Sequence, residues 1–401
     1  MDHIPKSAYT LHILFLEFTD RVPPRHILFL RTLSAEGFSV ESVCWRRSKV
    51  ALDKEINSNP NHIVLPAGWG KASLLILLPL LWYHQFQRLK KIRPDAIFVG
   101  HFLLLPIALA WRLWAGWAKV AVIYDALEHF PQHLAGYFGV FRKVAEPIIS
   151  FIENIGASLA SAVLCVDSSQ DQIENRFRKW NPRTLSIWNL PSLEDDPLHE
   201  NVCKIKHVYT EKLGVAFVGG LMPEKGIRNA LRAAVKVTRQ HPEALFLFIG
   251  PMMEDPEALG QIIKNYGLQA NVKFLPFMPY REMLAHLKHC KLAIAPHQHH
   301  YYHKLLSGGN GRKFFAYMQA GLAVVGPSMG EVGMAVDMAD CGMLVDTNSP
   351  DSIADAVIYL LSHGDIALQL GSNGRWAFES HFNWEVESYQ FLRLITNLLD
   401  K

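Results

Sequence analysis

Two glycine-rich turns in the second half of the chain contain the residue types that bind phosphate groups. In the first turn, GVAFVGGLMPEKG, an apolar strand is followed by Gly219, Gly220 and then Lys225. Glycines let an anion approach the backbone closely, and a lysine supplies a positive charge beside it. Taken alone, this turn is equally consistent with a tight strand-to-helix connection beside a solvated lysine.

The second turn, SGGNGRK, leads directly into the apolar helix FFAYMQAG. Backbone amides at the start of a helix bind anions, and neighbouring cations add to the attraction. Because both turns belong to the same half of the chain, we expect them to gather around one diphosphate. The candidates in the second turn are Gly308, Gly309, Asn310, Arg312 and Lys313.

Polar residues also follow apolar strands in the first half of the chain. They are Asp20 and Arg21 in the first turn, His101 after the strand ending at Val99, and Asp125, Glu128 and His129 after VAVIY. Ligands bind beyond the carboxyl ends of parallel strands, so we expect these side chains at the lip of a ligand cleft. Asp125 has the alternative role of capping the following helix.

A histidine-rich run, HQHHYYH, contains His297, His299, His300 and His303. Such a run suggests a metal site, but it includes no carboxylate or cysteine to complete a coordination sphere. Because the run follows an apolar strand directly, polar contacts to a substrate are the favoured interpretation. We therefore predict no metal site.

Alternating strands and helices must position these residues. The expected strands are 11–16, 40–45, 95–99, 120–124 and 162–166, followed by 215–218, 245–249, 272–275, 292–295, 323–325 and 343–345. Alternation of this kind indicates parallel strands joined by helices, and strands that are apolar on both faces indicate helices on both sides. The predicted fold class is α/β, with two Rossmann-like, doubly wound domains facing a central cleft.

The polar stretch 194–212 breaks the apolar pattern and marks the expected boundary between these domains. We expect an N-terminal domain over residues 1–195, a linker over 196–212 and a second domain over 213–380. A C-terminal helix over 381–401 is expected to pack back on the N-terminal domain.

The composition excludes several classes of protein. The 401 residues include 40 Lys and Arg against 37 Asp and Glu, so the formal net charge is only +3. This balance argues against nucleic-acid binding by bulk charge. The 5 cysteines show no CxxC spacing, which argues against a zinc site or a disulfide framework and fits a reducing cytoplasm. The first residues show no apolar secretory signal.

Two apolar stretches, 73–83 and 102–120, are too short or too interrupted by charge to cross a bilayer. Buried helices of an α/β domain are the favoured interpretation. The alternative is a peripheral contact with the inner face of a membrane, through tryptophans and basic residues in and beside these stretches. They are Trp69, Trp82, Trp111, Trp114 and Trp117, with Arg88, Lys90, Lys91 and Arg93.

Five segments together resemble glycosyltransferase family 4, which has the GT-B architecture and retains the anomeric configuration of the sugar. Residues 125–128 resemble the family's Asp-Ala-His-Glu box, and residues 189–191 its Asn-Xaa-Pro segment. Residues 217–226 resemble the Gly-Xaa-Leu-Xaa-Pro-Glu-Lys-Gly loop, and residues 245–251 the strand after it. KFFAYMQAGLAVV, residues 313–325, is similar to the family's Asn-Lys-Leu-Phe-Glu-Tyr-Met-Ala-Ala-Gly-Leu-Pro-Val-Val segment.

Four positions depart from the family pattern. Ala316 stands in place of the glutamate that holds the donor ribose, and Gly308 in place of a second glutamate. Gly220 replaces an arginine of the diphosphate site, and Leu127 replaces the histidine of the box. Each lost charged hydrogen bond corresponds to roughly 1.5 to 3 kcal/mol, so the substitutions indicate either an atypical donor site or one that has lost activity.

The resemblance implies a retaining transfer of a sugar from a nucleoside diphosphate sugar to a glycan, lipid-linked or small-molecule acceptor, as in polysaccharide or glycoconjugate biosynthesis. In this role Lys225, Asp125, Glu128 and His129 are the candidate catalytic residues, the two glycine-rich turns bind the donor, and His101, Arg21 and Asp20 face the acceptor. No cofactor and no obligatory metal are expected. The alternatives are an inactive GT-B protein that binds a sugar or a partner transferase, and an epimerase, for which the sequence shows no carboxylate pair.

Overall fold

The computed structural model describes residues 10–46, 60–65, 71–166, 173–197, 202, 205, 209, 211–297 and 311–400. Its internal contacts divide the chain into two units. The first is formed by Met1–Trp188 and Ser388–Lys401, and the second by Asn189–Glu387. Residues 189–195, which the sequence analysis assigns to the first domain, thus group with the second unit.

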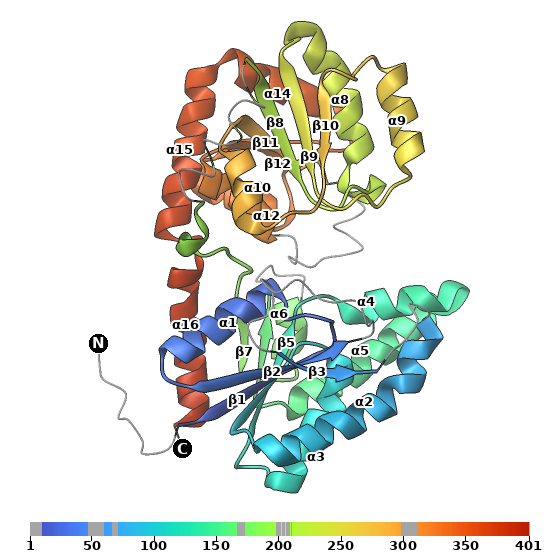
Figure 1. Cartoon of the computed structure of the whole chain (residues 1–401), viewed down its shortest axis with the longest axis vertical. Coiled ribbons are helices and arrows are strands. Elements are labelled where there is room, and N and C mark those ends of the chain that lie inside the picture. Colours follow the sequence, from blue (N-terminus) through green and yellow to red (C-terminus); the bar gives the residue numbers. More distant parts are fainter. Residues whose placement is uncertain are drawn as a thin grey trace. The chain divides into compact units, whose positions relative to one another are not determined.

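The first unit is built on a parallel sheet of seven strands in the order β3-β2-β1-β4-β5-β6-β7 (Figure 1). The strands are β1 (His12–Glu17), β2 (Ser39–Arg46), β3 (Pro60–Val64), β4 (Ala96–Val99), β5 (Ala121–Ala126), β6 (Ala162–Cys165) and β7 (Thr184–Ser186). The central strands β4, β5 and β6 are buried along their whole length, as expected for a sheet covered on both faces.

Helices cover both faces of this sheet because the side chains of each strand alternate between them. On one face, Leu14 and Leu16 of β1 share a core with α2 (Lys71–Ile92), α3 (Leu105–Ala115) and α5 (Arg142–Leu159). Figure 1 shows these three helices on the same side of the sheet. On the other face, Phe15 stacks on Phe98 at 4.4 Å between ring centroids.

The second face is closed by α1 (Pro24–Ala35) and α16 (Trp384–Leu399), whose rings Phe29 and Phe391 stack at 4.3 Å. Phe391 belongs to Ser388–Lys401, the part of the C-terminal helix that groups with the first unit. Two short helices, α4 (Phe130–Ala135) and α6 (Ile173–Arg178), complete the connections and contact α5.

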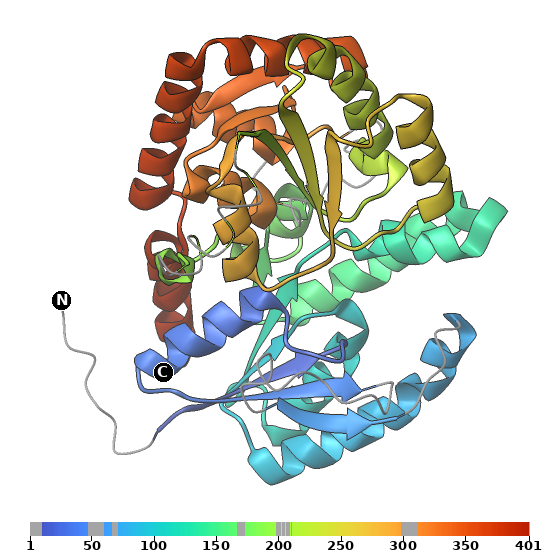
Figure 2. The same cartoon turned by 45° about the horizontal axis from the view of Figure 1, so that its top comes forward.

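The second unit has a parallel sheet of six strands in the order β10-β9-β8-β11-β12-β13. The strands are β8 (Leu213–Val218), β9 (Ala244–Ile249), β10 (Val272–Leu275), β11 (Cys290–Ile294), β12 (Ala323–Pro327) and β13 (Gly342–Val345). One face packs against α8 (Ile227–Gln240), α9 (Pro256–Asn265) and α14 (Pro350–Ser362). Figure 2 shows α14, in orange-red, beside α8, in yellow-green. The remaining helices are α10 (Tyr280–Leu287), α12 (Gly311–Ala320), α13 (Gly330–Ala339) and α15 (Gly364–Ser380).

The predicted fold class is confirmed, since both sheets are parallel and doubly wound. Every predicted strand is present, with ends that differ by a residue or two. The sequence pattern does not predict β3 and β7, which are the two edge strands of the first sheet. Edge strands bury less surface, so β3 can begin with a proline and β7 can be only 3 residues long.

Within the described ranges, no single helix is long and apolar enough to cross a membrane. One bent pair, Pro350–Ser362 with Gly364–Leu399, has the necessary length and composition only when its two parts are taken together. Four cysteines, Cys44, Cys165, Cys290 and Cys341, are buried free thiols. Cys203 lies outside the described residues.

Candidate functional site

The strand order of the second sheet reverses between β8 and β11, which are neighbours although β9 and β10 lie between them in sequence. In open parallel sheets, ligands bind beyond the carboxyl ends of the strands at such a reversal. The first glycine-rich turn follows β8, and residues 295–297 follow β11. The topology therefore brings two segments identified from the sequence to the position where a ligand is expected.

The turn after β8 is held tightly against its neighbours. The amide of Gly219 donates to the carbonyl of Ile249 at 2.9 Å, so this glycine contributes no amide to a ligand. The chain then passes through a short 3-10 helix, Pro223–Lys225, which ends at Gly226 with φ of 79°. A Cβ at Gly226 would lie 1.8 Å from the carbonyl oxygen of Pro296, so only glycine fits. This close approach fixes the turn on the segment after β11.

Lys225, His297 and Lys313 converge at this position. Lys225 is only 8% exposed, and its Cδ atom lies 3.7 Å from where a Cβ of Gly219 would be. Burial and then the charges of Lys225 and Lys313 lower the pKa of His297 to about 3, which places both ammonium groups within electrostatic range of one imidazole. The imidazole is therefore neutral at physiological pH. We call Gly219, Gly220, Lys225, His297 and Lys313 the second-sheet site.

The electrostatics of the second-sheet site suit an anion. Burial lowers the pKa of Lys313, because removing water disfavours its charged form. Among the described residues, no ion pair joins Lys313 to a carboxylate. A partly desolvated ammonium gains most when a negative charge arrives, so the surroundings of this lysine are suited to binding an anion.

Three polar residues that the sequence analysis does not single out hold the site in place. The hydroxyl of Tyr317 accepts from the amide of Val218 at 2.7 Å at the end of β8. Thr347 Oγ1 donates to the carbonyl of His297 at 2.5 Å, and Asn229 Nδ2 donates to the carbonyl of Thr347 at 3.0 Å. No local pattern marks these residues, because each one acts on a segment far away in sequence.

Arg312, predicted to bind the donor, contacts the segment around residue 195. Its guanidinium forms an ion pair with Asp195 at 3.0 Å and stacks over the ring of Tyr280 at 4.9 Å from the centroid. Both partners are half-buried, and Nη2 of the guanidinium makes the contact with Asp195. The two adjacent cations thus have different surroundings, since Lys313 acts on His297 and Arg312 pairs with Asp195.

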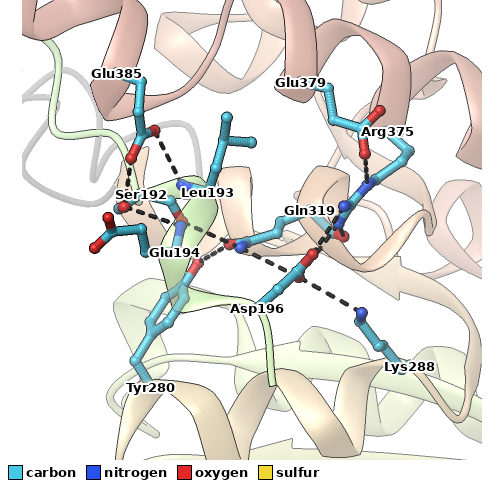
Figure 3. Close-up of polar contacts among 10 residues, drawn as sticks. All are labelled: Ser192, Leu193, Glu194, Asp196, Tyr280, Lys288, Gln319, Arg375, Glu379 and Glu385. Atoms are coloured by element: carbon cyan, nitrogen blue, oxygen red, sulfur yellow. Dashed lines mark hydrogen bonds and ion pairs between the residues drawn. The ribbon is translucent and has the colours of Figure 1, made fainter. Parts of the chain in front are cut away.

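Figure 3 shows how residues 192–196 are bound to the helices of the second unit. The carboxylate of Glu385 accepts from Ser192 Oγ at 2.5 Å and from the amide of Leu193 at 3.0 Å. Asp196 accepts from Arg375 at 2.8 Å and pairs with Lys288 at 3.5 Å. Residues 192–196, which follow the Asn-Xaa-Pro match, are therefore anchored to helices of the second unit.

Most of the second glycine-rich turn and most of the histidine run lie outside the part of the chain that the structure describes. Gly308, Gly309, Asn310, His299, His300 and His303 lie outside the described residues. Ala316, the position of the family glutamate, is completely buried in α12. Within the described residues, no group of three or more His, Cys, Asp and Glu side chains is arranged to hold a metal ion.

In the first unit, Asp125 lies in a buried charge cluster. Arg25 Nε donates to Asp125 at 2.9 Å, and His26 lies between Asp125 at 2.8 Å and Glu17 at 2.5 Å. All four side chains are at most 3% exposed. We call Glu17, Arg25, His26 and Asp125 the buried quartet. It ties the ends of β1 and β5 to the start of α1.

The buried quartet settles the protonation of its members. Burial lowers the pKa of His26, but Glu17 and Asp125 outweigh burial and raise it to about 9, so the imidazole is charged. Burial raises the pKa of Asp125, but Arg25 and His26 hold it below its usual value. Because Asp125 is 0% exposed and both its oxygens are bonded, it cannot contact a substrate in this conformation. Its position supports a structural role rather than direct chemistry.

His101 is better placed for contact with a ligand. It follows β4, which neighbours β1 at the strand-order reversal of the first sheet. Its ring stacks on Phe18 at 4.3 Å and on Phe130 at 4.2 Å, and Nδ1 accepts from the amide of Leu103 at 3.2 Å. That bond fixes the tautomer with a proton on Nε2.

The other residues predicted for this side differ in accessibility. Glu128 and His129 are half-buried and follow β5, and Phe130, which follows His129, contacts the His101 ring. Asp20 is half-buried, whereas Arg21 is exposed in a turn closed by Thr19. The structure therefore brings His101 and the 128–130 segment together beyond the carboxyl ends of β4 and β5.

Comparison with known proteins places this geometry in context. Residues 201–376 match the family model described as Glycosyl transferases group 1. An uncharacterized glycosyltransferase of Methanocaldococcus jannaschii is 26% identical over 219 residues, which cover 54% of this chain and 52% of that protein. The chain thus spans about half the length of the curated relatives it matches.

Two solved structures share the fold. Sucrose-phosphate synthase from Thermosynechococcus elongatus has a TM-score of 0.73 at 17% identity, with 97% of this chain and 99% of that chain covered. Anabaena HepE in complex with UDP has a TM-score of 0.71 at 15% identity, with 96% and 100% covered. The chain is therefore a protein of GT-B fold whose residues 201–376 match the family Glycosyl transferases group 1.

Proposed function

We propose that the protein transfers a sugar from a nucleoside diphosphate sugar to a glycan, lipid-linked or small-molecule acceptor, with retention at the anomeric carbon. The observation that carries the proposal is the convergence of Lys225 and Lys313 on His297 at the strand-order reversal of the second sheet. The family match over residues 201–376 includes all three residues. HepE, which shares the fold, is described as a complex with UDP.

In this proposal, the two lysines stabilise the leaving group. When the bond between the sugar and the diphosphate breaks, negative charge develops on the phosphate oxygen, and fixed ammonium groups stabilise that charge without reorganising. The lowered pKa of Lys313 shows that this side chain is partly shielded from water, which strengthens its attraction for the departing phosphate. The departing phosphate then takes the proton of the acceptor hydroxyl, so no carboxylate nucleophile is required.

His297 has a neutral imidazole and therefore adds a polar contact without adding charge. Its carbonyl is held by Thr347, so the ring is positioned from its backbone. In the first unit we assign acceptor orientation to His101, Glu128 and His129, and we assign to the buried quartet the task of holding the strand ends that carry them. Asp20 and Arg21 remain candidates for the acceptor side.

The test is nucleotide binding by isothermal titration calorimetry with UDP, GDP and ADP and the corresponding sugars. We expect one nucleotide to bind, and Lys225→Met and Lys313→Met each to weaken it by roughly tenfold to a hundredfold, the value of one charged hydrogen bond. Methionine keeps the apolar stem of lysine, so packing is preserved. Lys264→Met, at an exposed position of α9, is the matched control.

Two outcomes would contradict the proposal. If no nucleotide binds at millimolar concentration, the chain is a GT-B protein without a donor site, which is the inactive alternative. If a nucleotide binds and both methionine variants bind it as well as Lys264→Met does, the diphosphate lies elsewhere. Sugar transfer to a fluorescent acceptor library, with the anomeric product identified by NMR, then tests the retaining stereochemistry.

A further inference from the structure

Helix α5 exposes an unusually apolar stripe. Its outward side chains are spaced so that they lie on one face of the helix, opposite the buried residues Ile149, Asn154 and Ala157. Between 41% and 70% of each side chain is accessible, although all are large and apolar. The stripe consists of Phe141, which directly precedes α5, and of Val144, Ile148, Phe151, Ile152, Ile155 and Leu159 on the helix itself. We call this set the α5 stripe, and at 18 residues the helix that carries it is about 27 Å long.

The stripe continues into a set of exposed tryptophans. Phe151 contacts Trp180, which is 38% exposed, at 6.0 Å between ring centroids. At the C-terminal end of α5, Arg112 donates to the carbonyl of Leu159 at 2.8 Å and stacks over Trp117 at 4.1 Å. Trp117 is 43% exposed. A tryptophan therefore lies beside the stripe at two places along its length.

The acidic side chains near the stripe are paired with arginines, including Glu174 of α6, which pairs with Arg178. The helices α2, α3 and α4, and the 3-10 helix Gly136–Phe141, contain no aspartate or glutamate. The two glutamates of α5 are neutralised: Glu146 pairs with Arg142 at 3.8 Å, and Glu153 is buried with Arg176 and Tyr124. Exposed basic residues remain, namely Lys90, Lys91, Lys143, Lys179 and Arg183.

We propose that the α5 stripe docks the first unit on an anionic lipid bilayer, with the helix lying in the plane of the headgroups. A helix of this kind, with Phe and Ile on one face and cations beside them, inserts its apolar side at the boundary between headgroups and acyl chains. Tryptophan favours the same depth, and each basic residue near the surface is attracted by anionic lipid. The proposal extends to α5 the membrane contact suggested by the apolar segments 73–83 and 102–120 and the tryptophans in and beside them.

The same charge pattern argues against a second copy of this chain as the occupant. In a twofold dimer the same patch meets itself, so the basic side chains of one copy would face those of the other. The described face offers no unpaired carboxylate on α2, α3, α4 or α5 to compensate them. An anionic lipid surface satisfies both the apolar and the basic groups.

The experiment is flotation of the whole chain with vesicles of phosphatidylcholine, either pure or containing phosphatidylglycerol. We expect flotation with the anionic vesicles, less with the neutral ones, and a decrease at high salt. The double substitution Ile148→Glu with Ile152→Glu should reduce partitioning by about tenfold or more. Leu368→Glu, at a 72% exposed leucine of the second unit, is the matched control and should leave partitioning unchanged.

The result is independent of nucleotide binding, so it fails or succeeds separately from the proposed function. Melting temperatures of the two variants confirm that both remain folded, as expected for exposed positions. Absence of flotation with anionic vesicles, or equal flotation of the double variant and Leu368→Glu, would overturn the proposal. So would a dimer in light scattering that the double variant dissociates, because the stripe would then be a protein interface.

Discussion

Raising the pH should destabilise the first unit through His26. Its pKa is raised from 6.5 to about 9 in the folded protein because the imidazolium lies between Glu17 and Asp125. A group whose pKa is raised on folding stabilises the protein fully below its unfolded value, here below pH 6.5, and loses that contribution as the pH rises through about 9. Each pKa unit corresponds to about 1.4 kcal/mol, so the full contribution is about 3 kcal/mol.

The assay is urea denaturation at several pH values between 6.5 and 9, with unfolding monitored by tryptophan fluorescence. Tryptophan is a suitable probe because all tryptophans except Trp376 and Trp384 lie within Met1–Trp188 of the first unit. We expect the free energy of unfolding to fall by about 2 to 3 kcal/mol across this interval, while the dependence on urea stays constant.

The control is His26→Gln, which cannot change its charge. We expect this variant to be less stable at pH 6.5, because it lacks the cation between two buried carboxylates, and to show a much flatter pH dependence. If the variant loses stability between pH 6.5 and 9 as steeply as the parent does, another group is titrating. The assignment of a charged imidazole to the buried quartet would then be wrong.

Three further predictions concern the second unit. Gly226→Ala should destabilise it by more than about 2 kcal/mol in denaturant titrations, because the added Cβ would collide with the Pro296 carbonyl oxygen. The control Gly267→Ala, at a φ of 69° with open space around it, should cost only about 1 kcal/mol. Equal losses in the two variants would contradict the close approach at Gly226. Arg312→Ala should lower the melting temperature through loss of the Asp195 ion pair, and its nucleotide affinity in calorimetry should stay near that of the parent. A tenfold loss of affinity would show instead that Arg312 contacts the bound nucleotide. Because burial lowers the pKa of Lys313, nucleotide affinity should begin to fall at a lower pH than an ordinary lysine would give, and Lys313→Arg should abolish this alkaline fall in a pH series of titrations.

The helices, the glycine-rich turn after β8 and every strand except the edge strands β3 and β7 can be read from the sequence, because they depend on local patterns. Apolar runs such as VAVIY form strands wherever a sheet buries them, and the order of strands and helices determines a parallel sheet. The convergence of Lys225 with the segment after β11 follows from that same order, since both lie at the strand-order reversal. For the residues that follow strand ends, the sequence therefore predicts that they lie near one another beyond the carboxyl ends of the sheet.

What each polar residue contacts was decided only by the tertiary structure. Arg25 and Asp125 are 100 positions apart, and Asp125 changes from a candidate catalytic group to a buried one because α1 lies across its strand end. Arg312 and Lys313 are adjacent, yet Arg312 pairs with Asp195, whereas the charge of Lys313 lowers the pKa of His297. Hydrophobic periodicity specifies elements because it recurs over a few residues, whereas an ion pair depends on two atoms meeting within a few ångströms after the whole chain has packed.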